Sequence, residues 1–107
     1  MTEPSGVTME WLMEDAIDAR AGLSLARMTV APGVTSPAHR HPDCAEAVHV
    51  LAGRVEQRRD NAWLPLGAGE TLLIPCGAVH QTRNPGDEAA VLMVAYSSGA
   101  RVYLPEP

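Results

Sequence analysis

The chain has 107 residues and a mass of 11.4 kDa, which fits one compact domain, because most domains hold roughly 100 to 150 residues. Hydrophobic residues make up 46% and charged residues 20%, so a packed core can form and intrinsic disorder is excluded. Thirteen carboxylates against eight basic residues give a formal net charge of −5, and aromatic residues make up only 4%. The chain therefore lacks the basic surface and the stacking aromatics of a nucleic-acid-binding protein.

Apolar runs are short throughout the sequence. The run at 89–96 is far below the ~20 residues that cross a bilayer, and the acidic N-terminus lacks the pattern of a secretory leader. We therefore expect a soluble, cytoplasmic protein with no membrane partner.

The first 22 residues are predicted to be an extension that precedes the main domain. Residues 1–8 contain Pro, Ser and Gly and indicate a loose lead-in, and residues 9–13 are compatible with a strand. Residues 14–21 have a weak helical pattern that ends at Gly22, where a glycine is typical of a helix C-terminus. We therefore expect a strand followed by a short helix or turn.

The rest of the chain, residues 23–107, shows short β-compatible runs separated by turn residues. These runs are 23–31, 45–51, 54–59, 63–66, 71–74, 91–97 and 101–104. Short strands at a spacing of roughly 8–12 residues, with almost no helix, indicate a single antiparallel sandwich or small barrel. Such a barrel can hold a ligand or a metal ion in its interior.

Three histidines and one glutamate carry the first chemical signal. His39 and His41 are two residues apart, so on a strand both side chains project to the same side, which suits two ligands of one metal ion. Glu46 opens a predicted strand, and His80 follows a tight turn that begins at Pro75. The pair of histidines alone is equally consistent with a surface loop, but the four residues together indicate a metal site.

The position of Glu46 strengthens this interpretation. If Val48 and Val50 face the core, Glu46 faces it too, and a buried ionised carboxylate needs a cation to offset its desolvation. Three imidazoles and one carboxylate leave a divalent ion with a net positive charge. In octahedral coordination they also leave two positions open for water, dioxygen or a chelating substrate.

The residues around these four resemble the two motifs of the cupin superfamily. The first motif is matched by Gly33, His39, His41, Glu46 and Gly53, and the second by Gly69, Pro75, Gly77, His80 and Asn84. At about one in twenty per position, ten matches by accident have a probability of order 10⁻¹² to 10⁻¹³ per register. The short interval between the motifs, residues 54–68, resembles that of small bacterial single-cupin proteins.

This resemblance implies an all-β, cupin-type jelly-roll barrel, a double-stranded β-helix of six to eight strands, after the short N-terminal extension. It also implies that His39, His41, Glu46 and His80 hold a divalent transition metal (Fe, Mn, Ni, Cu or Zn) in the barrel mouth. The motif glycines would occupy turns. The implied function is a metal-dependent enzyme, dioxygenase-like or isomerase/lyase-like, that acts on a small oxygenated or anionic molecule chelated to the metal. A homodimer is expected, and a cupin that binds a sugar or effector without turnover is the alternative.

Other residues near the motifs have weaker claims to a chemical role. Tyr96 is the hydroxyl aromatic expected nearest a substrate, so Tyr96 and Glu46 are the candidate catalytic residues, with core packing as the alternative for Tyr96. Ligation by Cys44 or Cys76 is an alternative metal site. Otherwise we expect Cys76 to pack as a small apolar residue, Cys44 to be a free thiol near the opening, and no disulfide between them. His49 is three residues beyond Glu46 and is expected on the opposite face of the strand.

Overall fold

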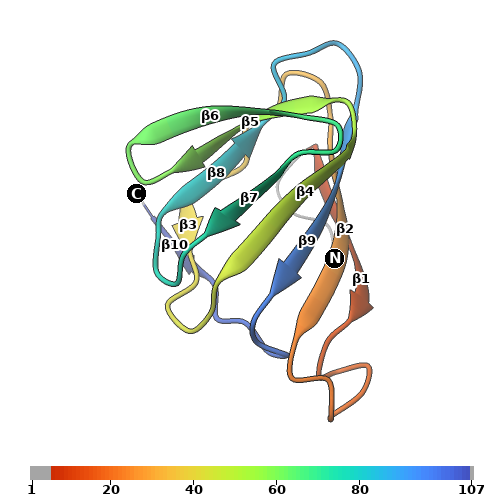
Figure 1. Ribbon diagram of the computed structural model, residues 1–107, viewed down its shortest axis with the longest axis vertical. Coiled ribbons are helices and arrows are strands. Elements are labelled where there is room, and N and C mark those ends of the chain that lie inside the picture. Colours follow the sequence, from red (N-terminus) through yellow and green to blue (C-terminus); the bar gives the residue numbers. More distant parts are fainter. Residues whose placement is uncertain (1–5, 107) are drawn as a thin grey trace.

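A computed structural model describes residues 6–106, and two layers of β-strands make up the fold (Figure 1). The strands in this range are β1 (Val7–Met13), β2 (Ser24–Val30), β3 (His39–Arg40), β4 (Glu46–Ala52), β5 (Arg54–Arg59), β6 (Ala62–Gly67), β7 (Thr71–Ile74), β8 (His80–Arg83), β9 (Ala90–Tyr96) and β10 (Leu104–Pro105). They form two five-stranded antiparallel sheets, β1-β2-β9-β4-β7 and β10-β3-β8-β5-β6. The all-β jelly roll is confirmed, with more strands than the six to eight expected because the two-residue strands β3 and β10 also pair.

The N-terminal segment differs in part from its prediction. Residues 1–5 of the expected lead-in lie outside the described residues, and Val7 and Thr8 already belong to β1, which pairs along β2. The helix expected at 14–21 is wrong: these residues form turns. The backbone N–H groups of Ile17 and Ala21 donate to the carbonyl oxygens of Glu14 and Asp18 at 2.9 Å each. These bonds close two separate turns, and a segment this short is not stable as a helix on its own.

No helix occurs in residues 6–106. In this range there is consequently no helix long and apolar enough to cross a membrane.

The core lies between the two sheets and is built by strict alternation along the strands. On β9, Ala90, Leu92, Val94 and Tyr96 face inward and are no more than 5% exposed. On β4 the inward positions begin with Glu46 and continue through two fully buried valines, as the sequence pattern predicts. The same alternation that builds the core therefore delivers a carboxylate into it.

Gly53 turns the chain from one sheet into the other, between β4 and β5. Its φ is +79°, and a Cβ atom there would lie 3.1 Å from both the Ala89 carbonyl oxygen and the Ala90 Cα. Gly69 has a similar φ of +88°, but a Cβ atom there would meet nothing within 4 Å. The expectation that the motif glycines occupy turns is confirmed, since Gly33 and Gly77 also have positive φ.

This difference predicts unequal costs for two equivalent substitutions. Gly69→Ala should lose about 1–2 kcal/mol of unfolding free energy, the usual cost of a left-handed conformation with a Cβ atom. Gly53→Ala should lose about 1–3 kcal/mol more, because backbone atoms cannot move aside for the methyl group. Urea denaturation of both variants checks this, and equal losses would contradict it.

Candidate metal centre

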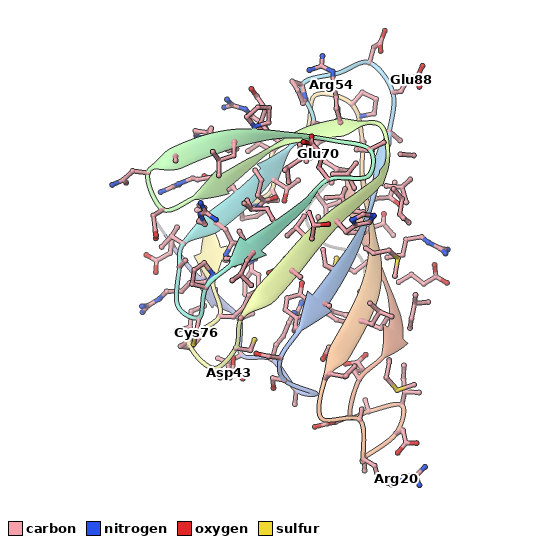
Figure 2. All side chains as sticks on the ribbon, in the orientation of Figure 1. Arg20, Asp43, Arg54, Glu70, Cys76 and Glu88 are labelled. Carbon is pink, nitrogen blue, oxygen red and sulfur yellow. The ribbon has the colours of Figure 1, made fainter. Side chains whose placement is uncertain are left out.

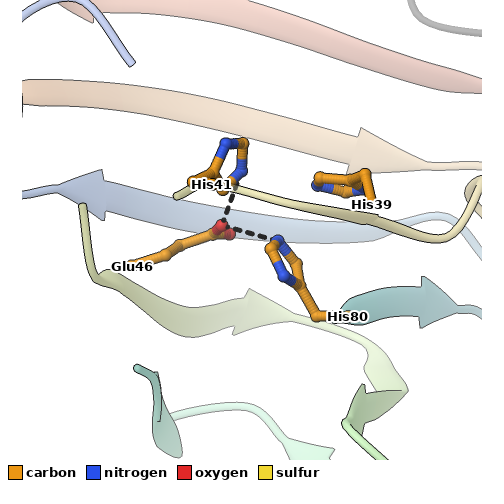
Figure 3. A group of neighbouring side chains, drawn as sticks. All are labelled: His39, His41, Glu46 and His80. Carbon is orange, nitrogen blue, oxygen red and sulfur yellow. Dashed lines mark ion pairs between the residues drawn. The ribbon is translucent and has the colours of Figure 1, made fainter. Parts of the chain in front are cut away.

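The four predicted ligands converge on one point between the two sheets (Figure 3). His39 is on β3, His41 follows it, Glu46 begins β4 and His80 begins β8. One ligand atom from each lies within 4.8 Å of the others. His39 and His80 are direct partners across β3 and β8, whereas Glu46 comes from the other sheet. The structure thus brings together the whole set that the sequence predicted.

Each histidine is oriented by a hydrogen bond from its second ring nitrogen. The Nδ1 atoms of His39, His41 and His80 lie 2.9, 2.8 and 2.9 Å from the carbonyl oxygens of Pro37, Val102 and Ala78. A carbonyl can only accept, so each Nδ1 carries a hydrogen and donates it. In the neutral ring this leaves the Nε2 lone pair available as a ligand, which is the arrangement that metal-binding histidines usually show.

Glu46 lies against two of these imidazoles in a buried position. Its Oε1 atom is 3.0 Å from His80 Nε2 and 3.4 Å from His41 Nε2, and the three residues are 2–5% exposed. Despite these short distances, none of the three atoms has a hydrogen-bond partner of acceptable geometry. Burial without partners is costly for such polar atoms, and a bound cation would supply the missing partner.

The protonation states also suit a metal. Burial opposes ionisation of Glu46, but the facing imidazoles of His41 and His80 outweigh it and hold the pKa of Glu46 at about 2. Burial, reinforced by the nearby His80, lowers the pKa of His39 to about 4, so this ring is neutral at neutral pH. Burial disfavours charge on His80 as well, yet Glu46 raises its pKa overall. A cation would take the place of that proton.

A small cavity, with about 30 Å³ of space that water could occupy, lies beside the four residues. Its wall consists of Val7, Met9, Met28, Ser36, Pro37, His39, Glu46, His80, Thr82, Tyr96, Arg101 and Tyr103. Three of the four candidate ligands therefore face the cavity, and His41 is not part of its wall. Tyr96 is 5% exposed and is also part of the cavity wall. It therefore packs in the core and lines the cavity at the same time.

Arg101 and Tyr103 are wall residues that the sequence did not reveal. Residues 101–104 were expected to form a strand, but β10 comprises only Leu104–Pro105. The irregular segment before β10 places the Tyr103 ring 4.6 Å from the His39 ring, nearly parallel to it. The one available signal was an arginine two residues before a tyrosine in a tail that carries no motif.

The two cysteines have the opposite environments from those expected. Cys44 is 3% exposed and belongs to the core, whereas Cys76 is exposed; both are free thiols. Cys76 lies near Asp43 where two loops meet (Figure 2), and its thiol is 3.1 Å from the Pro42 carbonyl oxygen. The correction has a simple reason: the turn at 75–77 directs its middle side chain outward. Neither thiol belongs to the ligand group found among the described residues.

His49 is outside this group, as predicted. Its Nδ1 atom lies 2.7 Å from the Thr71 hydroxyl oxygen on the neighbouring strand β7. It is partly exposed on the outer face of the first sheet. This histidine therefore serves as a control for the candidate ligands.

A jelly roll in which three imidazoles and one carboxylate converge beside an internal cavity defines a class of β-barrel protein with a candidate metal centre. Residues 26–96 match the family described as Cupin domain. The chain belongs to the cupin family.

Individual proteins show the same relationship. Germin-like protein 3-8 of Oryza sativa subsp. japonica is 38% identical over 82 residues, which are 72% of this chain and 36% of that protein. Polyketide synthase CurC of Streptomyces cyaneus is 41% identical over 69 residues, 64% of this chain and 42% of that protein. The chain thus spans well under half the length of these curated relatives.

Solved structures extend the likeness over almost the whole chain. An oxalate oxidase structure superimposes with a TM-score of 0.83 and 27% identity, covering 96% of this chain and 56% of the other. The formate complex of Lactobacillus farciminis oxalate decarboxylase gives a TM-score of 0.86 at 20% identity, covering 97% of this chain and 32% of the other. At that identity the second likeness shows the fold alone.

Replacing one ligand should abolish metal retention. In His80→Ala we expect metal affinity to fall by more than the roughly 10- to 100-fold that loss of a mere outer-sphere partner costs. The circular dichroism spectrum should be retained. Metal content of untagged protein, measured by mass spectrometry after dialysis, checks this. His49→Ala should keep its metal, and full occupancy in His80→Ala would show that the ligand set is wrong.

Proposed function

We propose that this chain is a metal-dependent enzyme that acts on a small oxygenated or anionic molecule, as a dioxygenase-like oxidoreductase or as an isomerase or lyase. The observation that carries the proposal is the placement of His39, Glu46 and His80 on the wall of the cavity. A closed structural metal site would bury its ligands away from any cavity. Here a molecule that enters the cavity reaches the ligand atoms directly.

A divalent transition metal held by His39, His41, Glu46 and His80 would polarise a coordinated carbonyl or enol and, if redox-active, would permit chemistry with dioxygen. The protein's part is to provide neutral imidazoles and one ionised carboxylate. Four protein ligands leave two positions of an octahedral ion for substrate or dioxygen. The choice among Fe, Mn, Ni, Cu and Zn stays open.

Tyr96 is proposed to orient the substrate through its hydroxyl group. Burial raises the pKa of Tyr96, and the negative charge of Glu46 raises it further. The phenol therefore stays protonated at neutral pH and can donate a hydrogen bond to a substrate oxygen. Glu46, the other proposed catalytic residue, would act chiefly as a ligand, since a carboxylate with a pKa of about 2 is a weak proton acceptor.

The apolar part of the cavity wall supports a reactive site rather than an open binding surface. Val7, Met9 and Met28 cover one side of the cavity and are 3%, 5% and 8% exposed. Such a wall excludes water from the ligands and strengthens the electrostatic interactions among them. The similarity to an oxalate oxidase structure favours the oxidoreductase alternative. The small bacterial single-cupin type and the cytoplasmic location stay predictions.

Turnover by the metal-loaded protein tests this proposal. We expect dioxygen uptake, or disappearance of substrate, with at least one of oxalate, catechols, enols, flavonols and thiols. Chelation by EDTA should abolish it, and Tyr96→Phe should lower kcat by roughly 10-fold or more through loss of one hydrogen bond. Binding of a sugar or small effector without any turnover would favour the alternative, a sensing cupin. If the purified protein holds no metal and chelation leaves its thermal stability unchanged, the proposal of a metal-dependent enzyme is wrong.

We further propose that the outer face of the first sheet is the contact of a homodimer. Apolar side chains follow one another across four neighbouring strands in register: Leu25, Ala95, Ala47 and Leu73. Leu73 is 56% exposed and Leu23, at the edge of this row, is 49% exposed. A continuous apolar row on a sheet face is typical of an interaction surface, and a two-fold partner would cover it with the same residues.

Light scattering coupled to size exclusion tests the dimer. The wild type should elute at twice the chain mass, and Leu73→Glu should shift it toward the monomer, because like charges would face each other across the two-fold axis. Ile17→Glu alters a residue that is 53% exposed in the β1–β2 turns and should leave the dimer intact. A monomeric wild type would overturn the proposal.

A further inference from the structure

Arg101 is a cavity residue to which the metal chemistry proposed above assigns no role. It follows β9, and its guanidinium carbon lies 4.5 Å from the centre of the Trp11 ring and 5.2 Å from that of the Tyr96 ring. Two aromatic faces therefore hold the guanidinium in place. It lies on the same cavity wall as the candidate metal ligands.

The guanidinium of Arg101 has no carboxylate partner in the described part of the protein. Arg20, Arg27, Arg40 and Arg83 each pair with a carboxylate. Arg101 forms no such pair within residues 6–106, and its Nε atom is buried without a hydrogen-bond partner. A guanidinium that is fixed against two rings and whose Nε–H has no acceptor offers a directed N–H group to a ligand.

The charges on the cavity wall make it favourable to an anion. Glu46 is the one carboxylate among the wall residues, and a divalent metal ion would more than neutralise it. Arg101 then leaves the cavity positive inside a protein whose formal net charge is −5, so anions enter favourably and cations do not.

We propose that Arg101 is the anion anchor of this site and that the substrate is a small carboxylate with a second oxygen function, such as a dicarboxylate or a 2-oxo or 2-hydroxy acid. One end of this molecule would coordinate the metal, and a carboxylate oxygen would accept hydrogen bonds from Arg101. The planar guanidinium matches a planar carboxylate better than a lysine would. The small, largely apolar cavity suits a ligand of few atoms. This inference rests on the proposed metal-dependent function and names its substrate class.

A purely structural role would also account for the position of Arg101, since it contacts Trp11 on β1 and Tyr96 on β9. The two roles make different predictions. A structural clamp would affect every ligand of the site equally, whereas an anchor would affect anions selectively. Binding of one anionic and one neutral ligand therefore separates them.

The experiment uses the Zn²⁺-loaded full chain and isothermal titration calorimetry with glycolate as the anion and imidazole as a neutral metal ligand. Arg101→Gln should weaken glycolate binding by roughly 10- to 100-fold, the usual effect of losing hydrogen bonds to a charged group. Imidazole affinity and zinc content should change less than about twofold. Arg101→Lys should recover part of the glycolate affinity, because it restores the charge without the planar group.

Arg27→Gln is the matched control. It removes one positive charge from an exposed ion pair with Glu10 and should leave glycolate affinity unchanged, which excludes an effect of net charge alone.

Four outcomes would overturn the inference. Unchanged glycolate binding in Arg101→Gln would exclude the anchor, and proportional losses of glycolate and imidazole binding would assign Arg101 a structural role only. Zinc-loaded wild type that does not bind glycolate would exclude the substrate class while leaving the metal site intact. Failure of the wild type to take up zinc would instead refute the proposed function, and the inference with it; zinc content measured beforehand distinguishes these cases.

Discussion

The arrangement of the site depends on one constraint: three backbone carbonyls fix the protons of three histidines. With Nδ1 of His39, His41 and His80 each donating to a carbonyl oxygen, the neutral rings can only present lone pairs to the centre. Glu46 adds a negative oxygen there. Several electron-rich atoms in a buried space repel one another unless a cation or a proton lies between them. The backbone thus orients three imidazoles around a candidate site whose buried polar atoms a metal ion would satisfy.

The register of the two sheets is what brings these atoms together. Glu46 is opposite Tyr96 and Ile74 in the first sheet, and His39 is opposite His80 in the second. A slip of one residue in β4 would turn Glu46 to solvent and expose Val48 with it. The burial of the valines therefore stabilises the position of the carboxylate, so the packing of the core fixes the geometry of the site.

The sequence predicted the parts of this structure that follow from periodicity and fixed spacing. Alternation placed Glu46 in the core, and the spacing of histidines and glycines indicated all four ligands and the turns around them. Prediction from the sequence failed where short segments and loops take their structure from contacts with other parts of the chain. The segment 14–21 is too short to be a stable helix alone and forms local turns that the Asp15 N–H ties to Gly99. The directions of Cys44 and Cys76 depend on how two loops meet. Arg101 belongs to a segment whose path is set by its packing on Trp11, ninety residues earlier in the chain.

Some residues of the cavity wall lie inside the region that matches the cupin family and others lie outside it, and this division bears on the specificity of the site. The family match covers residues 26–96 and contains all four candidate ligands. Several wall residues lie outside it: Val7 and Met9 on β1, and Arg101 and Tyr103 before β10. Trp11, which supports Arg101, also lies outside the match. The chain therefore combines a candidate metal centre inside the family match with cavity-wall residues from β1 and from the segment before β10. The family match accordingly bears on the candidate metal ligands, whereas under the proposals above residues outside it, such as Arg101, would decide which molecule reaches them.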